Sequence, residues 1–365
     1  MKITRIETAV SPENMVVVVR VGTDTGLEGL GQTAPRHADI TAAVLHALVI
    51  PHFLGQNPWD HQQLVDRCLR TEYKFNGSFL YRALCGVETA IWDLLGQATG
   101  QPVHALLGGA ARTAVPMYAS SMSREITPEG EAAQLSELVR RDGYRGVKIK
   151  IGGRMGRDAD ASPGRTEGLI VAMREAVGPA IAINADANGA YTAHKAIAIG
   201  RLLEKHNYHH FEEPCPFQEL ENTAAVAAAL DIPVAGGEQD NDLHDFARMI
   251  EQRMVDIVQC DIGYVGGIGR AVRVATLADT AGRPCTPHCA NHSLLQVFTL
   301  HLTAAMPACH DFQEWHANPD AAWEEFYTPR LRVIDGEVAV PTRPGWGVEL
   351  VPGFLDRATL KLASA

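Results

Sequence analysis

The sequence predicts an α/β protein in which a parallel barrel is attached to a smaller α+β domain. Two observations carry this prediction. The first hundred residues show strand patterns and then helix patterns, as in an α+β domain. From residue 114 onward, short apolar strands alternate with helical segments eight times, which favours a parallel barrel over an open sheet. At 365 residues the chain is long enough for both parts.

We place the α+β domain at residues 1–113. Alternating and β-branched residues predict three strands, at Met1–Val10, Met15–Val21 and Leu27–Gly31. The charged, alternating start of the chain indicates a strand and not a signal peptide. Apolar residues at helical spacing predict three helices, at about Ile40–Val49, Asp60–Arg70 and Phe79–Gln97.

We place the barrel at residues 114–325. Its eight strand candidates are Val115–Ala119, Gly146–Ile151, Ala182–Ala185, His209–Glu212, Pro233–Gly236, Ile257–Cys260, Pro284–Pro287 and Asp311–Gln313. A segment rich in Gly, Asp and Arg, Ile151–Glu167, is predicted to be a loop inserted after the second strand.

Residues 326–365 form a C-terminal segment that is too small to fold alone. Asp335-Gly336 predicts a hairpin turn between Leu331–Ile334 and Glu337–Val340. We expect this segment to return and pack on the N-terminal domain.

Composition excludes several classes of partner. The formal net charge of −11 disfavours nucleic acid and an anionic membrane surface, because both need clustered Lys and Arg. No apolar run is long enough to predict a membrane span. Seven cysteines are an odd number scattered over a long chain, unlike a disulfide framework, so we expect a cytoplasmic protein.

The strongest functional signal is the spacing of acidic residues. Asp186, Glu212 and Glu238 each follow an apolar strand at intervals of 26 residues, and Asp261 and His288 follow after 23 and 27 more. One βα unit is about that long, so these side chains are expected at the carboxyl ends of successive strands. A single acidic residue there is more often a helix cap, but five polar residues in register favour a site. Three converging carboxylates need a cation to balance their charge. Because carboxylate oxygens are hard ligands, the expected cation is Mg²⁺ first and Mn²⁺ second.

Two further pairs belong to this pattern. Lys148 and Lys150 are two residues apart on a predicted strand, so both are expected to point into the barrel mouth. There Lys148 can neutralise a carboxylate, and Lys150, near a metal and a second cation, can act as a base. If the partner of Lys148 is the carboxylate of a substrate, we expect Lys148→Met to leave folding intact and to weaken substrate binding and turnover. Asp261 can orient the ring of His288 and fix its tautomer.

A zinc site is the competing interpretation. Cys285, His288, Cys289 and His292 stand at helical spacing. Zinc ligands usually come as two separated pairs, however, and Pro287 interrupts any helix that would align these four. The carboxylate site is therefore favoured.

These motifs together resemble the enolase superfamily, and within it the mandelate racemase subgroup of the mandelate racemase/muconate lactonizing enzyme family. The resemblance covers nearly the whole chain. It rests on GQPVHALLGG at Gly100–Gly109, KIK at Lys148–Lys150, DAN at Asp186–Asn188, EEP at Glu212–Pro214, GE at Gly237–Glu238, the segment Asp261–Gly267, His288, and PGWGVE at Pro344–Glu349. A muconate-lactonizing relative would carry a lysine in place of Asp261, which disfavours that subgroup.

The resemblance implies a modified (β/α)7β barrel, similar to a TIM barrel, with an α+β capping domain formed by the N-terminal region and the C-terminal tail. It implies that Asp186, Glu212 and Glu238 bind Mg²⁺, which the carboxylate of the substrate chelates. Lys150 and the Asp261–His288 pair would then lie on opposite faces of the substrate. Lys148 and Glu314 would stabilise the enediolate, and relatives of this kind are commonly homo-oligomers.

Substrate contacts are harder to assign from the sequence. Some acid-sugar dehydratases have a histidine where this chain has Asn188. Arg124 is a candidate for binding a distal carboxylate or hydroxyl. His37, Tyr73 and Lys74 are candidate loop contacts, although an ordinary solvated loop residue explains each of them as well.

The resemblance favours one reaction over two alternatives. The leading function is dehydration of a sugar acid, an aldonate or aldarate, to a 2-keto-3-deoxy acid. The alternative is racemisation or epimerisation of an α-substituted acid, which would use the same two bases without a leaving group. A relative with an inactive site is disfavoured, because every expected ligand and base is present.

Overall fold

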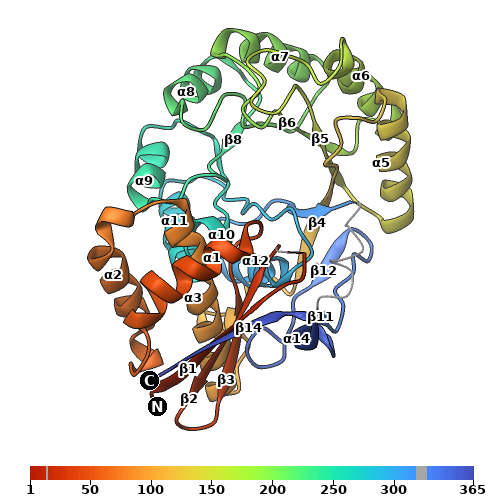
Figure 1. Ribbon diagram of the computed structural model, residues 1–365. Helices are drawn as coiled ribbons and strands as arrows, with labels where there is room; N and C mark the ends of the chain where they lie inside the picture. Colours follow the sequence, from red (N-terminus) through yellow and green to blue (C-terminus); the bar gives the residue numbers. More distant parts are fainter. Residues whose placement is uncertain (14, 318–326) are drawn as a thin grey trace.

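The computed structural model describes residues 1–13, 15–317 and 327–365. Seven parallel strands curl into a ring with helices on its outside (Figure 1). In spatial order the strands are β10 (Gln313–His316), β4 (Ala114–Ser120), β5 (Gly146–Lys150), β6 (Ala182–Asp186), β7 (His210–Glu212), β8 (Val234–Gly236) and β9 (Ile257–Val258). The protein is therefore an α/β barrel with a capping domain, as the sequence predicts.

One predicted barrel strand is reduced to a single bridge. Val258 pairs with Cys285 in an isolated parallel bridge, and no strand is assigned to Pro284–Pro287. Proline has no N–H to donate to a ladder, so Pro284 cannot extend the pairing, although His288, beyond Pro287, still donates to the carbonyl of Cys260 at 3.0 Å.

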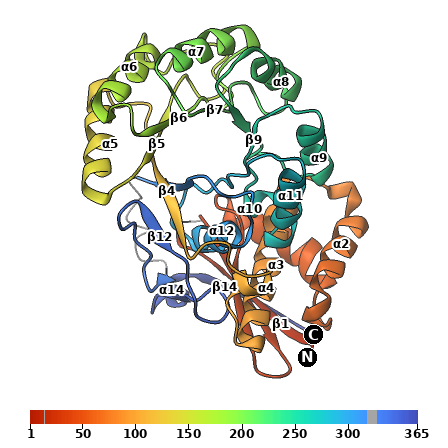
Figure 2. The same cartoon turned by 180° about the vertical axis from the view of Figure 1, so that it is seen from behind.

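The barrel helices cover the outer face of the ring (Figure 2). They are α5 (Pro128–Asp142), α6 (Arg165–Val177), α7 (Ala193–Lys205), α8 (Leu220–Ala229), α9 (Leu243–Glu251), α10 (Ile262–Val265), α11 (Ile268–Thr280) and α12 (Leu294–Ala305). Among the described residues, no helix is long and apolar enough to cross a membrane.

The capping domain is an antiparallel sheet with helices packed on it. Its strands, in spatial order, are β14 (Thr359–Ser364), β1 (Ile3–Val10), β2 (Val17–Thr23) and β3 (Glu28–Gln32). Its longer helices are α1 (Ala38–Val44), which continues as a π-helix over Leu45–Val49, α2 (His61–Thr71) and α3 (Ser78–Thr99). Shorter helices are Ile50–His52, Pro58–Asp60, Tyr73–Phe75 and α4 (Val103–Leu106).

The packing of α3 on β3 requires glycine. A Cβ added at Gly29 would meet the carbonyl oxygen of Ala90, and one added at Gly31 would meet that of Gly86. The sheet and the helix are thus in backbone contact, which any larger side chain would prevent.

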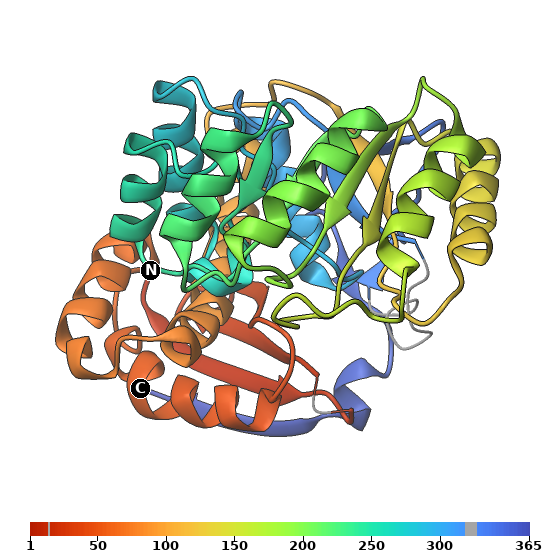
Figure 3. The same ribbon diagram turned by 90° about the horizontal axis from the view of Figure 1, so that it is seen from above.

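The C-terminal segment contacts both parts of the protein. Strand β14 runs beside β1, with Ser364 opposite Arg5. Figure 3 shows the capping domain, with the blue C-terminal strand at its edge, along one side of the barrel. The segment also contains β11 (Tyr327–Thr328), β13 (Glu349–Leu350) and α14 (Phe354–Arg357). The predicted boundary between residues 325 and 326 lies outside the described residues. The other domain boundaries stay predictions.

The predicted hairpin in this segment is wrong in its pairing. Leu331–Ile334 forms no strand, and only Ile334 bridges Glu337. Strand β12 (Glu337–Ala339) pairs instead with β4 of the barrel. The reason lies in the turn, because Gly336 donates to the carbonyl of Asp142 at 2.8 Å and accepts from the N–H of Met117 at 2.8 Å.

Helix α3 also joins the capping domain to the barrel through a buried carboxylate. Glu88 accepts hydrogen bonds from the N–H groups of Ile268 at 2.9 Å and Gly269 at 2.8 Å, at the start of α11. The indole of Trp92 donates to the same carboxylate at 2.8 Å. Without this acceptor, three donors would be left unsatisfied at a buried interface.

We expect Glu88→Ala to lower the free energy of unfolding by about 2–4 kcal/mol, since each buried donor without a partner costs about 1–3 kcal/mol. Chemical denaturation followed by circular dichroism measures this loss. Glu251→Ala, an exposed position at the end of α9, is the control and should change stability by no more than about 0.5 kcal/mol. Equal stability of the two variants would contradict the interpretation.

Candidate active site

Three carboxylates meet at the carboxyl ends of neighbouring barrel strands. Asp186 ends β6 and pairs in register with Glu212, which ends β7, and Glu238 follows β8 by two residues. One oxygen from each lies within 4.8 Å of the others. All three side chains are buried, so their mutual repulsion is not screened by water.

The carboxylates have the donor set that a divalent cation needs. Glu238 Oε2 is buried and makes no hydrogen bond, and its charged neighbour His288 Nε2 is 3.4 Å away. Burial raises the pKa of Glu238, and the carboxylates beside it add to this effect while His288 opposes it. Three buried oxygen donors with an unsatisfied atom fit a hard cation such as Mg²⁺ or Mn²⁺.

Lys148 lies among carboxylates and is fully buried. Its Nζ is 2.7 Å from Glu212 Oε1 and 2.8 Å from Glu314 Oε1. Burial by itself lowers the pKa of this ammonium, but the two carboxylates outweigh it and hold the pKa well above its usual range. Lys148 is therefore a fixed positive charge and not a proton acceptor.

Lys150 contacts a different carboxylate. It lies on the same face of β5 as Lys148, and its Nζ forms an ion pair with Asp186. Asp186 is further fixed by the N–H of Asn188 at 2.7 Å and by Asn188 Nδ2 at 3.1 Å. The two lysines thus approach the carboxylate cluster from the β5 side.

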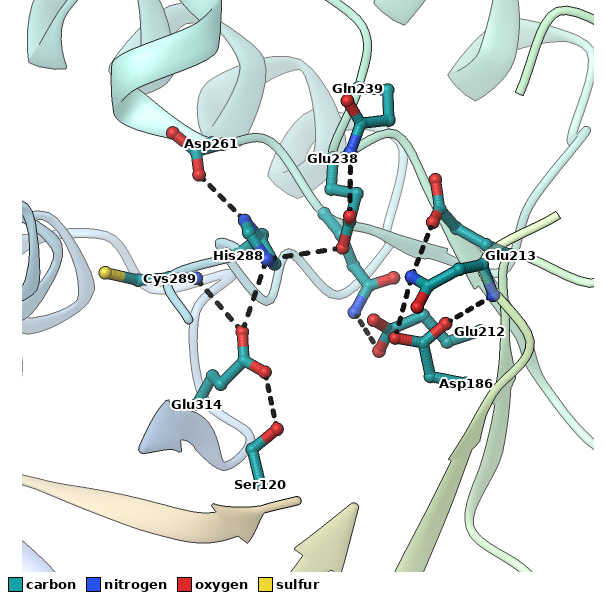
Figure 4. Close-up of polar contacts among 12 residues, drawn as sticks. Ser120, Asp186, Glu212, Glu213, Glu238, Gln239, Asp261, His288, Cys289 and Glu314 are labelled. Atoms are coloured by element: carbon teal, nitrogen blue, oxygen red, sulfur yellow. Dashed lines mark hydrogen bonds and ion pairs between the residues drawn. The ribbon is translucent and has the colours of Figure 1, made fainter. Parts of the chain in front are cut away.

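His288 reaches the cluster from the opposite side. Its Nδ1 is 2.7 Å from Asp261 Oδ2, and its Nε2 faces Glu238 (Figure 4). The other oxygen of Asp261 accepts from the N–H groups of Gly263 at 2.7 Å and Tyr264 at 3.1 Å, so the carboxylate that orients the ring is itself held in place. Burial alone would lower the pKa of His288, but Glu238 and the Asp261 hydrogen bond raise it to about 10.

Glu314, at the end of the barrel sheet, lies between His288 and Lys148. Its Oε1 accepts from Ser120 Oγ at 2.7 Å, and its Oε2 accepts from the N–H of Cys289 at 3.2 Å (Figure 4). Burial raises its pKa, but the positive charge of Lys148 outweighs this effect and lowers the pKa to about 2. Glu314 is thus an ionised group facing the same space as His288.

Of the weaker candidates, two lie at the cluster and three do not. Arg124 Nη2 donates to Asn188 Oδ1 at 2.9 Å, which brings both residues to the Asp186 side. His37, Tyr73 and Lys74 are exposed on the capping domain. In the part of the chain that the structure describes, these three make no hydrogen bond or ion pair with the cluster.

The zinc alternative is not supported. Within residues 1–13, 15–317 and 327–365, the only group of His, Cys, Asp and Glu side chains close enough to hold a metal is the three carboxylates. His288 Nδ1 faces Asp261, while His292 Nε2 lies 2.9 Å from the carbonyl oxygen of His316.

Several residues of the site escaped sequence analysis. Gln259 donates to Glu212 Oε2 at 2.9 Å and could have been found, since it stands two residues before Asp261. The guanidinium of Arg82, from α3, lies 3.7 Å from the ring centre of Tyr264, and the Tyr264 and His288 rings are 6.2 Å apart. No spacing rule could place Arg82 there, because it comes from the capping domain.

A barrel whose carboxyl end gathers a carboxylate cluster that fits a cation, between a lysine and a His–Asp pair, has the arrangement expected of a metal-assisted acid–base enzyme. Two family models match the chain. Residues 3–108 match the mandelate racemase/muconate lactonizing enzyme N-terminal domain, and residues 130–353 match the enolase C-terminal domain-like model. The chain therefore belongs to the mandelate racemase/muconate lactonizing enzyme family.

Similar proteins include dehydratases and one structure described as that of a racemase. An arabinonate dehydratase of Saccharolobus solfataricus is 27% identical over 95% of this chain and 91% of its own length. An L-talarate/galactarate dehydratase of Salmonella typhimurium is 29% identical over 93% and 81%. The crystal structure of a "putative racemase" from Roseobacter denitrificans is 44% identical, covers 100% of both chains and has a TM-score of 0.97.

Metal binding can be tested without a substrate. We expect protein treated with EDTA to bind one Mg²⁺ per chain in a calorimetric titration, because one oxygen of each of the three carboxylates lies within 4.8 Å of the others. Glu238→Gln should weaken this binding at least about tenfold, since it removes one ligand charge. Glu219→Gln, an exposed position, should bind as the wild type does. Equal affinity of the two variants would exclude Glu238 as a ligand.

The burial of Lys148 changes what we expect of its removal. Lys148→Met would leave Glu212 and Glu314 buried without their cation, and breaking such a pair costs about 3–5 kcal/mol. The variant should therefore unfold at a lower denaturant concentration, contrary to the sequence-based expectation of intact folding. Lys195→Met is the control, because its ion pair with Glu167, at 3.6 Å, is exposed and contributes about 1 kcal/mol or less. Unfolding at the same concentration as this control would contradict the prediction.

Proposed function

We propose that the enzyme dehydrates a sugar acid, an aldonate or aldarate, to a 2-keto-3-deoxy acid, and that its cofactor is Mg²⁺, with Mn²⁺ as a possible substitute. The observation that carries this proposal is the arrangement around the carboxylate cluster, with Lys150 at Asp186 and His288 at Glu238. The relatives named as arabinonate and L-talarate/galactarate dehydratases support the same reaction.

The first requirement is to bind the carboxylate of the substrate, because the α-hydrogen beside it is very weakly acidic and its removal adds negative charge to the carboxylate oxygens. A bound Mg²⁺ supplies Lewis-acid stabilisation of the charge that develops on the carboxylate oxygens. Lys148 adds a positive charge that is fixed before the substrate arrives, so no reorganisation is needed as the negative charge grows. The carboxylates of Glu212 and Glu314 keep this ammonium in place, and Ser120 in turn donates a hydrogen bond to Glu314.

The reaction then needs one base and one acid on opposite faces. Lys150, as the neutral amine, takes the α-proton, and the electron pair of that C–H bond moves into the carboxylate to give an enediolate. That pair then forms the double bond between Cα and Cβ as the Cβ–O bond breaks, and His288 gives its proton to the departing hydroxyl, which leaves as water. The resulting enol tautomerises to the 2-keto-3-deoxy acid. Asp261 holds the His288 ring so that Nε2 faces the substrate.

Racemisation or epimerisation remains the alternative, and it is favoured by the likeness to the Roseobacter denitrificans structure, which is described as that of a racemase. The same two groups would exchange the α-proton between faces, and no hydroxyl would leave. A homo-oligomeric state and a cytoplasmic location also stay predictions. Seven buried, unpaired cysteines support a reducing compartment.

Solvent exchange separates the roles of the two groups. In D₂O with a reactive sugar acid, His288→Asn should block elimination but still exchange the α-proton, because Lys150 remains. Lys150→Met should block both. Each loss should be about 10²–10⁴-fold, the usual contribution of one general acid or base. Proton NMR measures exchange and keto-acid formation in the same sample.

The possible results decide between the proposals. If the exchange pattern of the two variants is reversed, then His288 is the base and Lys150 the acid. If the wild type interconverts α-epimers and forms no keto acid, the enzyme is an epimerase. If neither substitution changes any proton transfer, this pair is not the acid–base machinery.

A further inference from the structure

The orientation of His288 depends on the short helix α10. Asp261, whose carboxylate lies 2.7 Å from His288 Nδ1 (Figure 4), is the N-cap residue of this helix. The other oxygen of Asp261 accepts from the N–H groups of Gly263 and Tyr264, both of which belong to α10. A movement of this helix would therefore move the carboxylate that orients the histidine.

The capping domain packs closely against α10. A Cβ added at Gly263 would lie 3.0 Å from the Cβ of Ala34, in the segment that follows β3. A Cβ added at Gly266, where α10 ends, would lie 3.1 Å from the ring of Tyr81 on α3. Both distances are shorter than an ordinary van der Waals contact. Two separate parts of the capping domain thus hold the backbone of this helix.

Arg82, which follows Tyr81 on α3, reaches α10 with its side chain. Its guanidinium carbon is 3.7 Å from the centre of the Tyr264 ring, a distance at which a cation and an aromatic ring attract each other. Its Nε donates to Ser78 Oγ at 2.8 Å, and its Nη1 donates to the carbonyl of Pro35 at 3.4 Å. None of the carboxylates that the structure describes forms an ion pair with it.

Tyr264 is close to the histidine in two ways. Its N–H donates to Asp261 at 3.1 Å, and its ring centre lies 6.2 Å from that of His288, within the range of interacting aromatic pairs. Misplacing a reacting group by about 1 Å can cost about 100-fold in rate. A residue that fixes Tyr264 can therefore change the rate without contacting the substrate.

We propose that Arg82 is a positioning residue for His288 and that it acts through Tyr264. This inference rests on the proposed function, in which His288 protonates the departing hydroxyl. Lys150 approaches the cluster from the β5 side and is held within the barrel, so its proton transfer should not depend on Arg82. The arginine should thus affect elimination but not the removal of the α-proton.

The first test uses the exchange assay in D₂O, with Mg²⁺ and a reactive sugar acid. Arg82→Met should slow keto-acid formation by about 10- to 100-fold, while KM and α-proton exchange stay as in the wild type. Arg273→Met is the matched control. Arg273 also joins the barrel to the capping domain, with Nη1 3.3 Å from Asp66 Oδ1, but it does so through α2. This control should keep the wild-type ratio of elimination to exchange.

A double variant tests whether Arg82 acts through Tyr264. Tyr264→Leu should also slow elimination and keep exchange. The double variant Arg82→Met/Tyr264→Leu should be no slower than Tyr264→Leu alone, because residues that act as a unit have non-additive effects. If the two losses multiply instead, Arg82 does not act through Tyr264 and the proposal is wrong.

A measurement without substrate tests the positioning itself. The proton between His288 Nδ1 and Asp261 should give a downfield proton NMR signal, identified by its absence in His288→Asn. In Arg82→Met the signal should broaden, because the hydrogen bond opens more often. In Arg273→Met it should stay as sharp as in the wild type.

The remaining outcomes separate this proposal from the proposed function. If Arg82→Met slows elimination and exchange equally, changes KM alone, or changes neither rate, the positioning role is wrong while the dehydration stands. If no sugar acid gives a keto acid but the NMR signal broadens as expected, the dehydration is wrong and the positioning role stands. If circular dichroism shows that Arg82→Met is unfolded, Ser78→Ala, which frees Arg82 Nε, should give a smaller loss with the same pattern. An unchanged pattern in a folded Ser78→Ala would then overturn the proposal.

Discussion

The concentration of buried negative charge at one end of the barrel is the constraint on which the site depends. Asp186, Glu212, Glu238 and Glu314 are all almost completely buried, and an isolated carboxylate in such surroundings would take up a proton. Lys148 prevents this for Glu212 and Glu314 but leaves Glu238 with an unsatisfied oxygen. The protein alone therefore balances only part of the negative charge, and the remainder fits a bound cation.

Strand register decides which charges meet. Asp186 and Glu212 are direct partners across β6 and β7, while Lys150 is the partner of Asp186 across β5 and β6. A shift of one residue in any of these pairings would turn a charged side chain away from the barrel mouth. Hydrophobic residues between them, such as Ile149 and Ala185, point outward into the core under the helices, so core packing and site geometry are fixed by the same alternation.

This dependence explains how much could be predicted from the sequence. The interval of 26 residues between Asp186, Glu212 and Glu238 reflects one βα unit, so local patterns were sufficient to place these residues at one end of the barrel. The two-residue spacing of Lys148 and Lys150 was equally informative. The pairing of β12 with β4 could not be predicted from local patterns. The partner of Glu337–Ala339 is decided by contacts of Gly336 with Asp142 and Met117, which are distant in the sequence. Pro284–Pro287 was predicted as a strand, but only Cys285 forms a bridge with the neighbouring strand, at Val258.

Residues from the capping domain complete the acid–base side of the site, and they are the part that sequence patterns reach least. The guanidinium of Arg82 lies over the ring of Tyr264. The backbone N–H of Tyr264 donates to Asp261, and Asp261 orients the ring of His288. Glu88, six residues further along α3, binds the start of α11. One helix thus sets the position of the capping domain and supports the histidine, so a change in how the cap sits on the barrel would reach His288 through Tyr264. On the other side, Lys150 is held by Asp186 within the barrel itself. In the proposed reaction, the two faces of the substrate are therefore served by groups with different supports, one inside the barrel and one dependent on the cap.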